Sequence, residues 1–99
     1  ANLQFAEFID ASLIGANFRE ADLSYANLIG ADLKQANFNY ADLTGANLIG
    51  TELRSSTFKQ AELTEADLRR TDLSQAILVK ANLAETNLSD ANLYEAELS

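Results

Sequence analysis

ADLTGANLIG, residues 41–50, consists of two five-residue units, each with Ala in the first position and Leu in the third. Amphipathic helices place apolar residues every three or four positions, and half-buried strands place them every two. Five residues turn an α-helix through about 500°, so successive Leu side chains would drift around its axis. In a flat strand an odd period would send Leu43 and Leu48 to opposite faces. The stretch therefore predicts a different backbone conformation, repeated in each unit.

The same five-residue unit extends without interruption over residues 1–99. The third position is Leu or Phe in every unit, the second is mostly Asn, Asp or Glu, and the fourth and fifth vary. The first position is Ala with four small exceptions, which are Thr51, Ser56, Thr71 and Thr86. A short fixed period is typical of a solenoid, in which similar units stack and bury a continuous core. We therefore predict one domain over residues 1–99, with the third position and the small first position pointing inward.

A second, longer period gives the number of units in each turn of the coil. Phe18, Phe38 and Phe58 occupy every fourth unit, and isoleucines recur at the same spacing elsewhere in the chain. A 20-residue period contains four five-residue units, so we expect a corner after each unit and four sides per turn. The sequence thus predicts an all-β solenoid of about five turns, each rising by about 4.8 Å, the usual distance between paired strands.

The repeated pattern A(D/N)LXX resembles the consensus of the pentapeptide-repeat family, and the resemblance covers all 99 residues. It implies a right-handed quadrilateral β-helix whose interior is filled by the Leu or Phe and by the small first residue. The family is most abundant in bacteria, particularly cyanobacteria, which implies a bacterial source. Many members have no assigned activity, and a fold alone does not define a function.

Composition excludes several classes of function. The chain contains no Cys or His, so we expect neither a structural zinc site nor a catalytic triad, and we expect no cofactor and no enzymatic activity. Its net charge of −8 argues against direct binding to nucleic acid or to an anionic membrane surface. No apolar run approaches the length of a membrane span. The residues indicate no compartment, and the cytoplasm is the default expectation.

The 20-residue period assigns each unit to one of four faces. Face 1 consists of the units that begin at residues 1, 21, 41, 61 and 81, and faces 2, 3 and 4 begin five, ten and fifteen residues later. Face 1 carries five acidic residues and no Lys or Arg, a net charge of −5, whereas the other faces mix both signs. These acidic residues are Asp22, Asp42, Glu62, Glu65 and Glu85.

A group of apolar residues is expected to point outward on face 2 and on the corner that leads into it. The group consists of Phe5, Ile9, Tyr25, Ile29 and Ile49. Exposed apolar patches often mark contact surfaces, which makes this group a candidate interaction surface. β-branched residues are also common on the outside of sheets, so the three isoleucines by themselves favour a structural role.

Three functions follow from these features. The first is a non-enzymatic scaffold or protein-interaction module with an unidentified protein partner. The alternative is an acidic mimic of DNA that inhibits a topoisomerase, because some relatives inhibit DNA gyrase in this way. Those relatives are about twice as long, and their charge is spread more widely. The third is architectural, because the first and last turns expose parallel edges. We expect either an end-to-end homodimer or a longer native protein.

Overall fold

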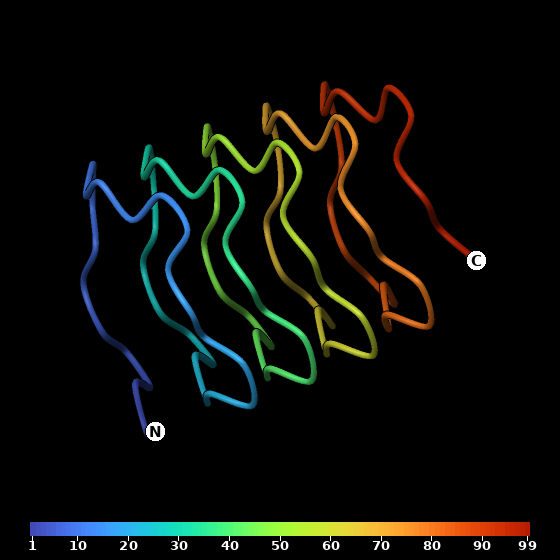
Figure 1. Cartoon of the computed structure of the whole chain (residues 1–99). Helices are drawn as coiled ribbons and strands as arrows, with labels where there is room; N and C mark the ends of the chain where they lie inside the picture. Colours follow the sequence, from blue (N-terminus) through green and yellow to red (C-terminus); the bar gives the residue numbers. More distant parts are fainter.

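The computed structural model describes residues 1–99 as a quadrilateral β-helix with no helix and no continuous strand. Each unit contributes an isolated parallel bridge at its second position, and the partner is the equivalent residue of the fourth unit after it, from Asn2↔Asp22 to Ile77↔Glu97. This offset is the one that the sequence predicts. Figure 1 shows the chain as a stack of similar turns, with the two termini at opposite ends. The right-handed quadrilateral β-helix implied by the family resemblance is the observed fold, which measures 30 × 24 × 23 Å.

A tight turn forms each corner of the coil. The fifth position has a positive φ in every unit from Phe5 to Glu95, with values from 55° to 71°. The next amide closes the turn, as where Ala46 N donates to the Leu43 carbonyl at 2.9 Å. A left-handed residue at this place is what a type II turn requires. Glycine adopts this conformation without steric strain, whereas in other residues it costs about 1–2 kcal/mol.

Backbone hydrogen bonds between turns hold the coil together. Between the second and third turns, Leu23 N donates to the Asp42 carbonyl at 2.7 Å, and Tyr25 N donates to the Thr44 carbonyl at 2.9 Å. In the reverse direction, Asp42 N donates to the Ala21 carbonyl at 3.0 Å. The same three bonds recur on all four faces, so each turn is registered on its neighbours by identical positions. Equivalent residues of successive turns therefore form continuous columns parallel to the axis.

The second position explains the preference for Asn and Asp. The side-chain oxygen of every Asn or Asp in this position accepts a hydrogen bond from the fourth-position amide of the same unit, as from Ile29 N to Asn27 Oδ1 at 3.2 Å. This side-chain-to-backbone bond stabilises the turn that follows. Glu52 and Glu62 occupy the same position and make no such bond, because their side chains are one methylene longer. Asn and Asp are therefore structural at this position, whereas Glu leaves the turn without this support.

The core consists of first-position and third-position side chains. It is fully buried from Phe18 to Leu78, and the end turns are more open, with Leu98 52% exposed. Phe18 and Phe38 stack with ring centroids 5.2 Å apart, and Phe38 stacks on Phe58 at 4.8 Å. The inward assignment made from the sequence is thus confirmed for the central turns. The aromatic column adds stacking energy to the burial of apolar area.

Thr51 is the one buried side chain whose polar atom has no hydrogen-bond partner. It is 1% exposed and occupies a first position on face 3. Thr71, the next residue in the same column, is 2% exposed and donates its hydroxyl to the Leu68 carbonyl at 2.9 Å. Burying a hydroxyl without a partner costs free energy, whereas a bonded hydroxyl is close to neutral or favourable.

We predict that Thr51→Val raises the free energy of unfolding by about 1 kcal/mol, because valine keeps the shape and removes the unpaired hydroxyl. Thr71→Val is the matched control and should be neutral or destabilising, because it removes a hydrogen bond and leaves the Leu68 carbonyl without this donor. Urea unfolding followed by circular dichroism measures both variants. Equal changes in the two variants would contradict the assignment of Thr51 as unsatisfied.

Candidate interaction surface

Phe5 and Tyr25 lie in one column, at the corner between face 1 and face 2. Their rings stack with centroids 5.6 Å apart and planes 13° from parallel. The side chains remain open to solvent, because Phe5 is 69% and Tyr25 is 53% exposed. Both residues occupy fifth positions with φ of 61°, so the left-handed turn holds each ring outside the coil. The structure therefore brings together two aromatic rings that belong to the first and the fifth unit of the sequence.

The fifth-position side chains of Tyr25 and Asp10 lean along the axis toward the following turn. A Cβ atom added to Gly45, the next residue in this column, would lie 2.5 Å from Cε1 of Tyr25. Tyr25 thus covers the bare backbone of Gly45, as Phe5 covers Tyr25. Asp10 covers Gly30 in the same manner at the corner between faces 2 and 3. The absence of a side chain at Gly45 is what allows the Tyr25 ring to lie against the coil.

The three isoleucines form a second column, at the fourth position of face 2. Ile9 is 51% exposed, whereas Ile29 and Ile49 are half-buried. The column of second-position residues, including Asn27 and Asn47, lies between the isoleucines and the aromatic corner. All five residues of the candidate surface therefore belong to the first three turns and to one side of the molecule. Ile29 and Ile49 are therefore less accessible to a partner than Ile9 is.

The acidic residues of face 1 fall into two chemically different groups. Asp22 Oδ1 accepts hydrogen bonds from the amide and the hydroxyl of Ser24, at 3.1 and 2.6 Å. Asp42 makes the same pair of bonds with Thr44, at 3.0 and 2.6 Å. In Asp22 the Ser24 hydroxyl is the main cause of a lowered pKa. These two carboxylates are engaged in the turns of the coil.

The remaining acidic residues of face 1 extend beyond the backbone of the coil. Glu62 accepts a hydrogen bond from Asn82 Nδ2 at 3.0 Å. Glu65 and Glu85 are exposed, their carboxylates have no hydrogen bond or ion pair, and they continue the column of Phe5, Tyr25 and Gly45. This corner is therefore aromatic in the first two turns, bare in the third and acidic in the last two. Its negative charge is available to a partner.

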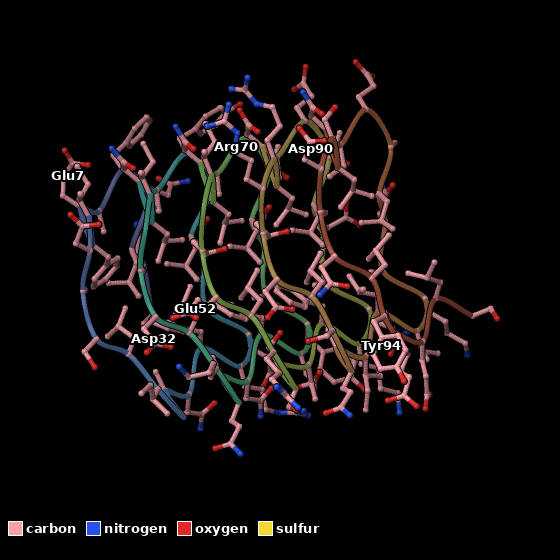
Figure 2. The ribbon with its side chains drawn as sticks, turned by 90° about the horizontal axis from the view of Figure 1, so that it is seen from above. Glu7, Asp32, Glu52, Arg70, Asp90 and Tyr94 are labelled. Carbon is pink, nitrogen blue, oxygen red and sulfur yellow. The ribbon has the colours of Figure 1, made fainter.

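Face 2 also carries a depression that the sequence did not reveal. It has a volume of about 530 Å³ and is lined by Ile49, Arg69, Arg70, Asn87, Ser89 and Asp90. Arg70 and Asp90 project from the same edge of the molecule as Glu7 (Figure 2). Its lining includes Arg69 and Ser89, which follow Ile49 in the fourth-position column of face 2. Only the shift from apolar to charged residues at Arg69 and Arg70 could have indicated it.

One wall of the depression is fixed by an ion pair. Arg69 Nε lies 2.9 Å from Asp67 Oδ1, and Arg69 Nη2 lies 2.7 Å from Asp67 Oδ2. The hydrogen bonds from Arg69 hold the pKa of Asp67 below its ordinary value of 3.8 and raise the pKa of Arg69. The Ser74 hydroxyl lowers the pKa of Asp72 similarly. Both carboxylates therefore contribute stability above about pH 3.8, and it is lost as the pH falls through their folded-state pKa values.

No group of Asp, Glu, His and Cys side chains in the chain is arranged to hold a metal ion. The structure contains no candidate for a membrane-spanning helix. The geometry of the outer surface instead offers apolar area, free carboxylates and two shallow depressions, the second of about 180 Å³ on face 3.

Comparisons with known proteins agree with this architecture. The family model described as pentapeptide repeats matches eight copies, over residues 1–39, 36–75 and 66–99. No curated protein matches the chain. The chain is similar to the solved structure of the pentapeptide-repeat protein Rfr23 from the cyanobacterium Cyanothece 51142. That likeness has a TM-score of 0.92 at 33% identity and covers 94% of this chain and 64% of the other.

Two further solved structures share the fold. The pentapeptide-repeat protein alr5209 from Nostoc Pcc 7120 is 44% identical over 78% of this chain and 64% of its own, with a TM-score of 0.76. QnrB1, a plasmid-mediated fluoroquinolone resistance protein, is 24% identical over 99% of this chain and 56% of its own, with a TM-score of 0.62. The likeness to QnrB1 shows the fold alone. The chain spans less than two thirds of the length of each of these proteins.

We predict that Gly45→Ala is more destabilising than Gly50→Ala. Both substitutions strain a left-handed residue and cost about 1 kcal/mol for that reason. Only Gly45→Ala also displaces the Tyr25 ring, because nothing lies within 4 Å of a Cβ added to Gly50. Urea unfolding measures the difference. In a Tyr25→Ala background the two substitutions should have equal cost, and a persistent difference would contradict the placement of Tyr25 over Gly45.

Proposed function

The chain belongs to the pentapeptide-repeat family, and from this premise we propose that it is a non-enzymatic scaffold that binds a protein partner. The binding site is the apolar surface made by Phe5, Ile9, Tyr25, Ile29 and Ile49. The observation that carries this proposal is the stacked and exposed pair of Phe5 and Tyr25, on the same side of the molecule as the isoleucine column and separated from it by one column of polar second-position residues. Aromatic side chains held rigidly in solvent are typical anchors of protein interfaces.

The fold does not require aromatic rings at this corner. Gln35, Ser55 and Gln75 occupy the equivalent fifth positions on face 3, in the same left-handed conformation. A ring exposed to water gains little for folding, and it carries the same backbone strain as a polar residue. A contact with a partner would bury these rings, and the burial of their apolar area would stabilise the complex.

A non-enzymatic role is supported by the chemistry of the outer surface. The chain has no His or Cys to act as a base or nucleophile. Asp22, Asp42, Asp67 and Asp72 are hydrogen-bonded within their own units and stabilise the turns. The depression on face 2 lacks a carboxylate pair or a nucleophile set against a base, which general acid–base and covalent catalysis need.

Association of two copies end to end remains part of the proposal. In the first turn the second-position amides, including Asn2 N and Glu7 N, have no partner within the chain. In the last turn the first-position carbonyls, including Ala81 and Ala91, likewise accept no bond from a following turn. The two ends are complementary, since such a pairing is the one that joins consecutive turns. This contact would leave the apolar surface on face 2 open.

We predict that Ile9→Asp and Ile29→Asp abolish capture of the partner, because a charge replaces an apolar contact at the surface. A tagged chain incubated with a lysate of the producing organism would retain the partner, and both variants would lose it. Ile14→Asp is the matched control, because Ile14 is 53% exposed at the fourth position of face 3. Unchanged circular dichroism and melting temperature establish that all variants fold. Equal capture by Ile29→Asp and the native chain would contradict this surface.

The alternative function is mimicry of DNA by the acidic face, with DNA gyrase as the target. Its support is the column of Asp22, Asp42 and Glu62, whose backbones are paired in successive turns. The hydrogen bonds that Asp22 and Asp42 make within their own units weaken it, because one oxygen of each is already engaged.

We therefore expect no inhibition of gyrase supercoiling by the purified chain at about micromolar concentration, a range that specific protein complexes reach. Inhibition that disappears in Glu65→Gln and Glu85→Gln, and persists in the control Glu95→Gln, would favour mimicry over the scaffold.

A further inference from the structure

We propose that the occupant of the apolar surface is a basic amphipathic helix that lies parallel to the axis of the coil. This inference rests on the proposed function and adds the chemistry and the conformation of the partner. It follows from three features of the outer surface, which are the spacing of the apolar columns, their continuation into charged residues, and the distribution of charge on the adjoining faces.

The spacing of the columns matches a helix. Equivalent residues are adjacent in neighbouring turns, so Ile9, Ile29 and Ile49 repeat at about 4.8 Å, the distance between paired strands. Apolar side chains on one side of an α-helix repeat at about 5.4 Å, one helical turn. Across the three isoleucines the two spacings diverge by only about 1.2 Å. A partner helix can thus place an apolar residue against each turn.

An extended peptide fits this surface less well. Side chains on one face of a strand repeat every second residue, or about 6.8 Å, so the register would be lost by about 4 Å over the same length. A strand also gains affinity from an open sheet edge, and on face 2 the backbone groups are already paired between turns. The apolar columns lie on the flat side of the coil, where only side chains are presented. The surface therefore favours a helix docked by its apolar side.

The charge beside the columns specifies a basic partner. The aromatic column continues through Gly45 into Glu65 and Glu85, whose carboxylates have no hydrogen bond or ion pair. Face 1, on the outer side of this corner, has a net charge of −5 and no basic residue. Lys or Arg residues that follow the apolar stripe of a helix would lie against these carboxylates. Such contacts at an interface rim promote association and orientation.

The two corners of face 2 differ in charge, and this difference defines how the helix is turned. Arg69 is neutralised by Asp67, whereas Arg70 projects at the opposite corner without an ion pair. The column of Arg70 also carries Asp10 and Asp90, so this corner mixes both signs, and the basic residues of the partner are expected on the wholly acidic flank toward face 1. The chain itself contains no helix, so a second copy would not supply the helical occupant. A nucleic acid would be repelled by face 1.

The direct test uses a fluorescent helical peptide of about 18 residues, with Leu every third or fourth position and Lys along one flank. We expect binding with a Kd of about 10–100 μM, as for a small transient interface, measured by fluorescence anisotropy at low salt. Two control peptides have the same length. One moves the Leu residues to every second position, and the other replaces Lys with Glu. Each control should bind at least about tenfold more weakly.

Matched variants of the chain locate the peptide. Ile9→Asp should weaken binding about tenfold, and Ile14→Asp on face 3 should leave it unchanged. The double variant Glu65→Lys with Glu85→Lys should weaken binding about tenfold at low salt and less at high salt. The double variant Glu95→Lys with Glu97→Lys changes the net charge equally, on faces 3 and 4, and should have a smaller effect. Equal effects of the two double variants would overturn the assignment of the charge contact.

The outcomes also separate this inference from the proposed function. Failure of the helical peptide to bind, together with loss of the natural partner in Ile29→Asp, would overturn the helix and keep the scaffold. Tighter binding of the peptide with alternating Leu would replace the helix by an extended segment. Sedimentation over a concentration series tests whether a second copy of the chain occupies the surface. A dimer that Ile9→Asp dissociates would assign the surface to a second copy and overturn the proposal.

Discussion

The left-handed conformation at the fifth position of every unit is the constraint on which the rest of the structure depends. Its φ stays between 55° and 71° along the chain. Each such residue turns the chain through one corner, and four corners return the backbone to the same place one strand spacing further on. The identity of the columns, the ladder between turns and the inward direction of the third position all follow from this repetition. The left-handed region is unfavourable for L-residues. The backbone hydrogen bonds that each turn makes with its two neighbours offset this cost.

The same constraint separates the positions that specify the fold from those that are free. The first and third positions are confined by the interior, where Phe38 and Leu43 are fully buried. The second position is confined when it is Asn or Asp, because its oxygen holds the fourth-position amide. Most fourth and fifth side chains project outward, where a replacement changes the surface, but Ser24 and Ser74 are buried and Gly45 lies beneath an aromatic ring. Because the turns stack in register, the outward side chains of every fourth unit form a continuous stripe along the molecule.

The sequence predicted the period, the inward positions and the face to which each residue belongs, because these depend only on counting residues along a uniform coil. It did not show that Glu at the second position lacks the backbone bond that Asn and Asp make, since that difference depends on the reach of a side chain to one amide. It also did not reveal the unpaired hydroxyl of Thr51, or that Ile29 and Ile49 are half-buried whereas Ile9 is exposed. Those properties depend on how a side chain leans against the next turn, which a repeat pattern does not encode.

The difference between the rise of the coil and the pitch of a helix limits the length over which the two can match. It is about 0.6 Å per turn, so rigid apolar contacts stay in register over three turns and lose it gradually beyond them. The three isoleucines occupy a length within this limit. In the last two turns the neighbouring column changes to Glu65 and Glu85, whose long side chains can follow a displaced basic group. The transition from stiff apolar to flexible charged residues therefore occurs where the geometry of a docked helix would require it.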